Sequence, residues 1–426
     1  MADNTSKNLR NLMMYQIFVR NYSEDGNFAA VQADLDRIKA LGTDIVYLMP
    51  IHPIGTKNRK GSLGSPYAIS DYRAVNPEFG TLEDFKNLVN AIHEKGMKCI
   101  IDVVYNHTSP DSVLSKEHPE WFYHKEDGSF GNRVGDWSDI IDLDYSNEGL
   151  WDYQIETLKY WAEMVDGFRC DVAPMVPVAF WDRARKEVAT VRPDCIWLAE
   201  SIEYSFITHL RGRGITAHSD AEIFHAFDVS YDYDVYPDLA AYCKGEKSLD
   251  AYLGGVNRQE VIYPDNYVKL HFLENHDQTR AHFLIPDERE LRNYTAFMFF
   301  QKGMPFVYAG QEFGASHLPS LFDKDTIALK PEGGIDMSGL IKSLSDIKKN
   351  DIFTDGIFEC SRTMNDTVVA TITKGDRKAV GIFALAAATS NVRVPLEDGI
   401  YRNLIDGKDI EVFRGGVQCY GEPIII

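Results

Sequence analysis

Three acidic residues stand in separate strand-like segments of this chain, and their side chains could carry acid–base chemistry. They are Asp171, Glu200 and Asp277, and an arginine and two histidines lie close to them in the sequence. A carboxylate beside an apolar strand is costly to bury unless it has a partner or takes part in a reaction. The alternative is a structural ion-pair network, which barrels also contain. All three carboxylates together favour an acid–base site for a sugar.

The elements that must position these carboxylates alternate between strand-like and helix-like segments over residues 11–310. Thr81 and Asp84 form a capping-box pattern ahead of one such helix, at 82–92. Polar residues stand at the carboxyl ends of the strands, where barrel active sites are built. The sequence therefore predicts an α/β protein with a (β/α)₈ TIM barrel, and a doubly wound open sheet is the alternative. The eight expected strands are 13–19, 44–49, 98–104, 167–171, 195–200, about 224–229, 267–273 and 306–308.

Two regions depart from the alternating pattern. Residues 108–146 are polar, aromatic and rich in turn formers, which predicts a small inserted subdomain after the third strand. From about Asp351 short strands separated by Gly, Asp and Asn predict a C-terminal antiparallel β domain over 351–426. The barrel itself is expected to comprise 1–107 and 147–350. The expected C-terminal strands are 358–362, 368–373, 379–385, 392–395 and 422–426.

Composition and charge exclude several classes of function. The formal net charge of −20 argues against nucleic acids and anionic membranes as partners. No apolar run is long enough to span a membrane. The six cysteines are scattered without a C-x-x-C pair, which predicts free thiols, and residues 1–7 carry no apolar signal segment. These features predict a cytoplasmic protein; the alternative is a secreted protein whose signal has been removed.

Four short segments occur in the order and at the spacing of the four sequence regions of the α-amylase family, glycoside hydrolase family 13. The early segments 64–67 and 71–72 also resemble that family, as does the β-rich C-terminal region. The resemblance thus covers nearly the whole chain, and the ordered set is far more specific than any single member. The four segments are Asp102–His107, Gly167–Asp171, Ala199-Glu200 and Asn275–Asp277.

The resemblance implies retaining cleavage of α-glucosidic bonds, mainly α-1,4, in starch- and glycogen-derived oligosaccharides. It implies that Asp171 is the nucleophile, Glu200 the general acid/base, and Asp277 the carboxylate that stabilises the transition state. An oxocarbenium-like state needs an anion on one face of the ring and a proton donor near the other. Arg169 is two residues before Asp171 in a strand, so both side chains point to the same side. Arg169 is therefore expected to keep Asp171 ionised and oriented.

The resemblance also implies substrate-binding roles for three further residues. His107 and His276 match histidines that hold hydroxyls of the cleaved sugar, and Tyr67 matches an aromatic that stacks on it. Arg169 completes the predicted substrate-binding set. Asp102 is expected to be structural, bound to Arg169 or to backbone.

A calcium ion is the one cofactor that the resemblance raises. After Asp171 the chain reads Val-Ala-Pro-Met, where calcium-binding relatives often continue with Ala and then a Lys-His pair. Asn106 is the one candidate oxygen ligand, and hard cations need six or more oxygens. We therefore expect no required cofactor, with calcium at Asn106 as the alternative.

Several functional alternatives stay open at the level of the sequence. A 4-α-glucanotransferase, a neopullulanase and an α-glucosidase share the same covalent intermediate and differ in linkage, acceptor or substrate length. A non-catalytic amylase-like barrel that assembles with a partner is a further alternative, but it would be expected to lack some of the three carboxylates. Trp137, Met175 and Phe206 either line downstream sugar subsites or pack in the core.

Overall fold

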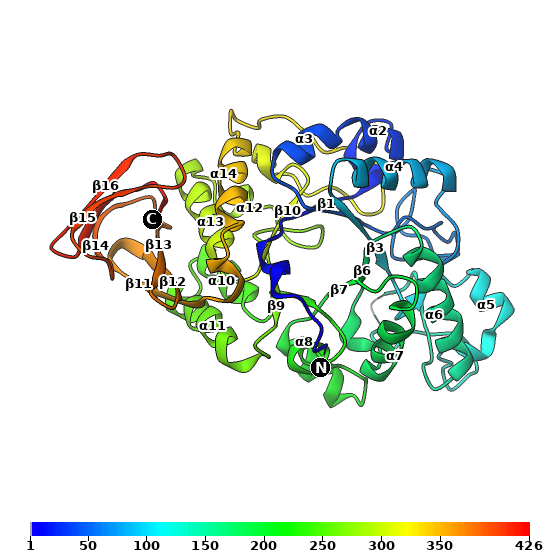
Figure 1. The fold of residues 1–426 in the computed structure, drawn as a ribbon. Helices are drawn as coiled ribbons and strands as arrows, with labels where there is room; N and C mark the ends of the chain where they lie inside the picture. The colour runs from blue at the N-terminus through cyan, green and yellow to red at the C-terminus, as the bar shows by residue number, and fades with distance from the viewer. Residues whose placement is uncertain (1, 136) are drawn as a thin grey trace.

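The computed structural model describes residues 2–135 and 137–426 of the protein, and in this part of the chain eight parallel strands close into a barrel (Figure 1). Each strand pairs with its sequence neighbours, and the first pairs with the last. This topology confirms the predicted TIM barrel and rules out the open sheet. The barrel strands are β1 Met14–Ile17, β2 Ile45–Leu48, β3 Lys98–Val103, β6 Gly167–Cys170, β7 Ile196–Ala199, β8 Val229–Tyr231, β9 Val268–His271 and β10 Met304–Tyr308.

Helices surround the barrel because each has one apolar face that must be buried. In α4 the buried residues are Phe85, Leu88, Val89 and Ile92, and the predicted capping box at its start is present. The α-helices are α1 Val19–Tyr22, α2 Phe28–Ala33, α3 Leu35–Ala40, α4 Leu82–Glu94, α5 Val113–Glu117, α6 Glu148–Ala162, α7 Val178–Val188, α8 Tyr204–Gly212, α9 Asp220–Ile223, α10 Tyr236–Cys243, α11 Leu249–Ile262, α12 Ala281–Leu284, α13 Glu288–Phe300, α14 Ser338–Lys348 and α15 Ile352–Asp355.

The sixth barrel strand lies later than predicted. Residues 224–228 form a turn that follows α9 and is buried except at His225, and β8 begins only at Val229. Asp228 explains the difference, because its side chain accepts the Trp197 amide at 2.9 Å and an Arg185 guanidinium hydrogen bond, also at 2.9 Å. Such a short apolar run does not distinguish a strand from a buried turn.

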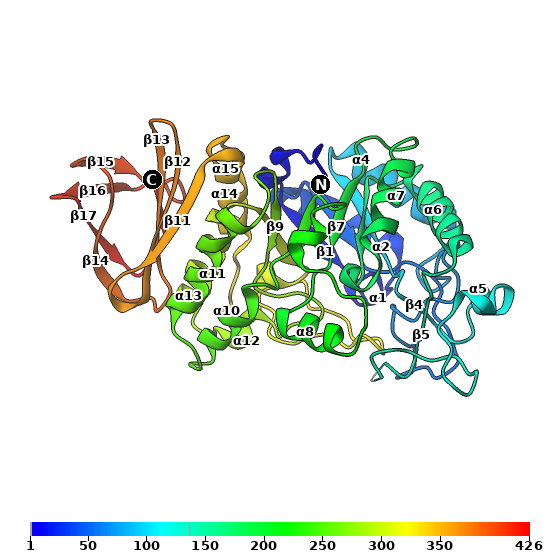
Figure 2. The same cartoon turned by 90° about the horizontal axis from the view of Figure 1, so that it is seen from below.

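The segment inserted after β3 lies on the opposite side of the barrel from the C-terminal sheets (Figure 2). It contains α5 and a two-stranded antiparallel ladder of β4 (His107–Thr108) and β5 (Ile141–Asp142). His107 pairs with Asp142 in that ladder, so the insertion is anchored at a predicted substrate-binding residue. The predicted domain limits at 107/108, 146/147 and 350/351 stay predictions.

The C-terminal region forms two four-stranded antiparallel sheets, as expected for an all-β domain. β11 packs against α11 and β13 against α13, which joins this region to the barrel (Figure 2). Three strands, β15 to β17, were absent from the prediction because exposed polar residues interrupt their apolar positions. The sheets are β11 Ile357–Arg362, β12 Thr367–Lys374, β13 Arg377–Ala384 and β18 Ile424–Ile425, and β14 Thr389–Arg393, β17 Gly416–Tyr420, β16 Asp409–Phe413 and β15 Gly399–Arg402.

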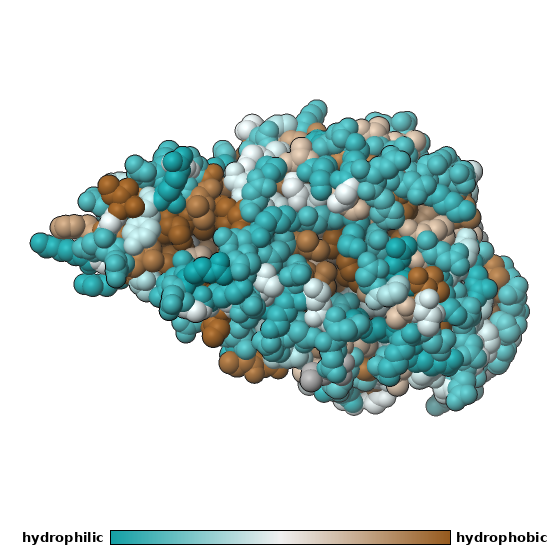
Figure 3. Space-filling model, viewed as in Figure 1, coloured by the Kyte–Doolittle hydropathy of each residue, from teal (hydrophilic) through white to brown (hydrophobic). Residues whose placement is uncertain are grey.

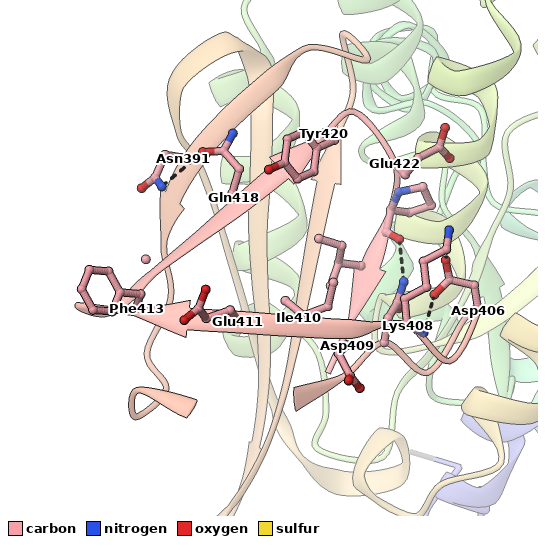
Figure 4. Close-up of a pocket in the computed structure, with 14 residues that line it drawn as sticks. Asn391, Asp406, Lys408, Asp409, Ile410, Glu411, Phe413, Gln418, Tyr420 and Glu422 are labelled. Atoms are coloured by element: carbon pink, nitrogen blue, oxygen red, sulfur yellow. Dashed lines mark hydrogen bonds and ion pairs between the residues drawn. The ribbon is translucent and has the colours of Figure 1, made fainter. Parts of the chain in front are cut away.

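Hydrophilic residues cover most of the face seen in Figure 3, and hydrophobic ones gather over the C-terminal sheets. There β16 and β17 pair at only two positions, and a cavity of about 460 Å³ is lined by residues of these strands and their neighbours (Figure 4). Phe413 and Tyr420 border it and are exposed. All residues that line this cavity lie between 391 and 424. It is therefore separate from the predicted site in the barrel.

All six cysteines lie in the described part of the chain and are free thiols, five of them buried and Cys243 half-buried. No described helix is long and apolar enough to cross a membrane.

Candidate active site

The three predicted carboxylates meet at the carboxyl-terminal end of the barrel. Asp171 directly follows β6, Glu200 directly follows β7, and Asp277 lies in the loop after β9. Parallel strands place their carboxyl ends at one mouth of the barrel, where βα loops build active sites. The fold therefore brings together residues that lie 106 positions apart in the sequence, from 171 to 277.

A single buried guanidinium holds two of these carboxylates and a third acidic group. Arg169 Nη1 donates to Asp171 Oδ1 at 2.9 Å and contacts both carboxylate oxygens of Asp102 at 3.0 Å. Its Nη2 forms an ion pair with Glu200 Oε1 at 2.8 Å. Arg169 is fully buried, and Asp102 lies opposite it in the β3–β6 register. The predicted contacts of Arg169 with Asp171 and Asp102 are thus present, and Arg169 also fixes Glu200 relative to Asp171.

Burial favours the protonated forms of Asp171 and Asp102 in this cluster. Burial raises the pKa of Asp171 well above its ordinary range, the Glu200 carboxylate raises it further, and Arg169 opposes both effects. Burial also raises the pKa of Asp102 to about 6, again opposed by Arg169. One guanidinium cannot balance three ionised carboxylates in a buried site. The raised pKa of Asp171 runs against the expectation that Arg169 keeps this carboxylate ionised, and the nucleophile of a retaining enzyme must be ionised to attack.

The backbone after Asp171 is in a left-handed conformation that a β-branched residue rarely adopts. Val172 has φ +35° and ψ +44°, and its N–H donates to Glu200 Oε2 at 2.7 Å. Such a conformation costs on the order of 1–3 kcal/mol and persists where the surroundings enforce it. The bend turns a backbone donor toward Glu200. Sequence reasoning missed this contact, because the residues around Asp171 give no indication of a positive φ.

His276, Tyr67 and Asp277 form a second connected group. His276 Nε2 lies 2.6 Å from the Tyr67 hydroxyl and 3.1 Å from Asp277 Oδ2, and the two rings stack with centroids 5.4 Å apart. Burial lowers the pKa of His276 to about 3, so its imidazole is neutral. The Tyr67 hydroxyl also donates to Asp102 at 3.1 Å, which links this group to the Arg169 cluster.

Gln16 in β1 selects the tautomer of His276, and sequence reasoning did not identify it. Its amide nitrogen lies 2.8 Å from His276 Nδ1. The Asp277 carboxylate beside Nε2 favours a proton on Nε2, which leaves Nδ1 as an acceptor for the Gln16 amide. The Nε2–H is then directed toward the Tyr67 hydroxyl and the Asp277 carboxylate. A polar residue in the otherwise apolar segment 13–19 was the available signal.

We expect Gln16→Leu to lower kcat/KM about tenfold, because the imidazole loses the donor that fixes its tautomer, about 1.4 kcal/mol. Gln16→Glu should raise the pKa of His276 and shift the acidic limb of the pH–activity profile upward. Steady-state kinetics from pH 4 to 8 measure both effects. Gln301→Leu is the matched control, since that buried amide donates to Tyr252 instead. Unchanged kinetics and pH profiles in both Gln16 variants would show that the contact is only structural.

His107 and Asn106 form the edge of the site that faces the inserted segment. His107 Nε2 lies 3.9 Å from Asp171 Oδ2, and its Nδ1 accepts the Asn106 amide at 3.1 Å. Burial lowers the pKa of His107 to about 4, so this ring is also neutral. The Trp137 ring lies 5.8 Å from it. The site therefore combines a neutral histidine on each flank with a cluster of carboxylates between them.

An apolar wall borders Asp171 and Glu200 on the side of the inserted segment. It is one hydrophobic cluster to which the insertion, the loop after β6 and α8 all contribute. Trp137 and Phe206 are half-buried in it, and Met175 is buried. The sequence left these three residues open between subsite and core. The structure shows that they pack in this cluster, and their role at a sugar subsite stays a prediction. The members are Val134, Trp137, Val172, Met175, Ile202, Phe206, Ile207, Leu210, Ile215 and Ala217.

Known proteins resemble this chain over its whole length. The family model of the α-amylase catalytic domain matches residues 16–140 and 115–353, and that of the bacterial α-amylase C-terminal domain matches 359–426. A solved α-amylase from Lactobacillus plantarum is 49% identical, with a TM-score of 0.96 and 99% of each chain covered. A noncanonic maltogenic α-amylase, AmyB from Thermotoga neapolitana, is 33% identical, with a TM-score of 0.87 and 98% of each chain covered.

Two curated relatives match more partially. The α-amylase MalA of Haloarcula japonica is 28% identical over 71% of this chain, and an α-1,4-glucan:maltose-1-phosphate maltosyltransferase of Rhodospirillum rubrum is 40% identical over 41%. The matched parts span only 44% and 28% of those two proteins. The family models, in contrast, account for both the barrel and the C-terminal sheets. The chain therefore belongs to the α-amylase family.

Proposed function

We propose that this protein is a retaining glycoside hydrolase of the α-amylase type. It cleaves α-glucosidic bonds, mainly α-1,4, in oligosaccharides derived from starch or glycogen. The observation that carries the proposal is the single guanidinium of Arg169, which holds Asp171 and Glu200 side by side at the mouth of the barrel. A nucleophile and a proton donor in that arrangement are what retaining cleavage requires.

The reaction proceeds in two balanced steps. Glu200 gives its proton to the glycosidic oxygen while Asp171 attacks the anomeric carbon, so the leaving sugar departs with a hydroxyl and a glycosyl ester forms. Glu200, now a carboxylate, then takes a proton from water, and the water oxygen attacks the anomeric carbon and displaces Asp171 from the sugar. Two inversions at one carbon retain its configuration. Asp277 and the neutral His276 hold ring hydroxyls and stabilise the cationic transition state.

The substrate is an uncharged sugar because the site offers hydrogen bonds and ring faces. His107, His276 and Tyr67 present neutral polar groups beside the carboxylates. The surplus negative charge of the cluster would repel phosphate or carboxylate substrates. The formal net charge of −20 for the whole chain supports the expectation that neither nucleic acids nor anionic membranes are partners.

Transfer to a second sugar is the other candidate reaction, and the apolar wall favours it. Trp137, Met175 and Phe206 could bind an acceptor sugar on the leaving-group side, in competition with water. The relative named as a maltosyltransferase supports the same possibility. A neopullulanase and an α-glucosidase share the intermediate. A non-catalytic role has little support, because the three carboxylates and Arg169 are all assembled.

Product analysis by chromatography tests the proposal. The enzyme is incubated with maltoheptaose and, in parallel, with pullulan. We expect only products shorter than seven glucoses, whose glucose content equals that of the maltoheptaose consumed. Longer products would establish a glucanotransferase, and panose or maltotriose from pullulan would establish neopullulanase or α-1,6 activity. No turnover of either substrate would contradict the proposal.

We propose that the protein works in the cytoplasm. The six free thiols, five of them buried, suit a reducing compartment and gain nothing from an oxidising one. Fractionation of the source cells followed by an immunoblot measures this directly, and recovery from the medium would contradict it.

A further inference from the structure

The inserted segment carries a guanidinium at the point where it returns to the barrel. Arg133 Nη1 donates to the Leu143 carbonyl at 3.2 Å and lies 3.6 Å from Asp142 Oδ2. Its Nη2 lies 4.0 Å from Asp144 Oδ1, and its backbone N–H donates to Asp142 Oδ2 at 2.7 Å. One residue thus contacts three consecutive positions at the end of the insertion.

The surroundings keep this guanidinium in place. Its central carbon lies 4.6 Å from the centroid of the Tyr123 ring, a cation–π contact. Its side chain is 30% exposed, whereas that of Asp142 is 1% exposed. Burial raises the pKa of Asp142 to about 6, and the Arg133 amide and guanidinium oppose this rise. Arg133 is therefore the positive charge that offsets a carboxylate buried in the insertion.

The segment that Arg133 holds is joined directly to the active site. The Leu143 amide donates to the Asn106 carbonyl at 3.0 Å, and Asp142 pairs with His107 in the β4–β5 ladder. A cavity of about 270 Å³ beside Arg133 is also lined by Asn106, Asp142 and Asp144. Asn106, the candidate calcium ligand in the sequence, therefore lines the same cavity as the cationic Arg133.

The residues present do not fit a divalent cation here. The cavity is lined by only two carboxylates, those of Asp142 and Asp144, and both face the Arg133 guanidinium. The other side-chain oxygens are uncharged and belong to Asn106, Tyr145, Ser146 and Thr216, a poor set for a hard cation. The described residues contain no group of three or more His, Cys, Asp or Glu side chains that could hold a metal ion. Asp142 Oδ1 is buried without a hydrogen-bond partner, so it could supply one oxygen ligand. A hard cation needs six or more. A dication in this cavity would also be repelled by the guanidinium.

We propose that Arg133 takes the place of the structural calcium and fastens the inserted segment to the barrel with its own charge. A guanidinium can do this because its planar donors contact a carbonyl and two carboxylates at once. The consequence is a segment whose order, and with it the His107 flank of the site, is independent of divalent cations.

Thermal unfolding of the full-length protein tests the proposal without any assay of activity. We expect the wild-type Tm to change by less than about 1 °C between excess EDTA and millimolar CaCl₂, because no dication is bound. Arg133→Met should lower the Tm by at least about 2 °C and speed limited proteolysis within 108–146 at least about threefold. Lys116→Met, an exposed change in the same insertion, is the matched control.

A charge-reversed variant provides the opposite test. Arg133→Glu adds a carboxylate beside Asp142 and Asp144, so its Tm should rise in CaCl₂ while that of the wild type does not. If Arg133→Glu does not fold, Arg133→Gln is titrated with CaCl₂ in its place, and its Tm should rise by less. A wild-type Tm that falls by several degrees in EDTA and recovers with calcium would overturn the proposal. Arg133→Met with wild-type Tm and proteolysis would overturn it as well.

Discussion

The Asp171→Asn variant is expected to fold like the wild type and to lose at least ~10³-fold in kcat, because an amide cannot form the glycosyl ester. The change is nearly isosteric, and the amide oxygen can still accept from Arg169 Nη1. Burial raises the pKa of the Asp171 carboxyl, so its ionised form is costly in the folded protein. Removing that charge should leave the Tm unchanged or raise it.

The measurement combines turnover of maltoheptaose with a thermal unfolding curve for each protein. Asp182→Asn, on α7, is the matched control, since its partly exposed carboxylate pairs with a surface lysine, Lys186. Activity of Asp171→Asn at the level of the wild type would show that Asp171 is not the nucleophile. A large fall in Tm would instead show that the Arg169–Asp171 contact is needed for folding, and the kinetic result could then not be assigned to chemistry.

Sequence patterns were sufficient for the fold because buried parallel strands leave a strong local signal. All eight barrel strands overlap their predicted segments in the structure, but β8 does so only at Val229. That difference arose at 224–228, where apolar residues are buried in a turn and Asp228 caps the neighbouring strand through its side chain. The C-terminal strands with exposed polar positions were missed for the converse reason, since half of each strand faces solvent.

Some residues of the candidate site can be identified from the local sequence, and others only from the contacts that the closed barrel creates. Arg169 and Asp171 share one strand, so their common orientation follows from a period of two. The Gln16–His276 contact joins the first strand to the loop after the seventh, and nothing local to either residue indicates the other. Val172 is similar, because its left-handed backbone depends on surroundings that bring Glu200 to its amide.

Arg169→Leu is expected to abolish activity and to cost about 3–5 kcal/mol of folding stability, since it leaves buried carboxylates without their cation. Arg169 lowers the pKa of both Asp102 and Asp171, so its loss should raise both further. A carboxyl with a folded pKa above its unfolded value keeps its proton longer in the folded state. Its contribution to stability is full at low pH and is lost as the pH rises through the folded pKa.

The Tm difference between Arg169→Leu and the wild type should therefore be smallest near pH 5 and largest near pH 8. Calorimetry across that range measures it. With Arg169 present the pKa of Asp102 is about 6. The additional loss of stability in Arg169→Leu should therefore appear mostly above pH 6. Adding Asp102→Asn to Arg169→Leu removes one of the unpaired carboxylates and should recover part of the stability without any activity.

Arg169→Lys separates charge from geometry. An ammonium keeps the positive charge but cannot contact Asp102, Asp171 and Glu200 together, as the two guanidinium nitrogens do at 2.8–3.0 Å. We expect most of the stability to return and most of the activity to stay lost. Equal recovery of both would mean that charge alone is sufficient. A pH-independent Tm difference for Arg169→Leu would mean that its carboxylates are neutralised by other means, and the proposed role of this guanidinium in orienting the nucleophile and the acid would have to be abandoned.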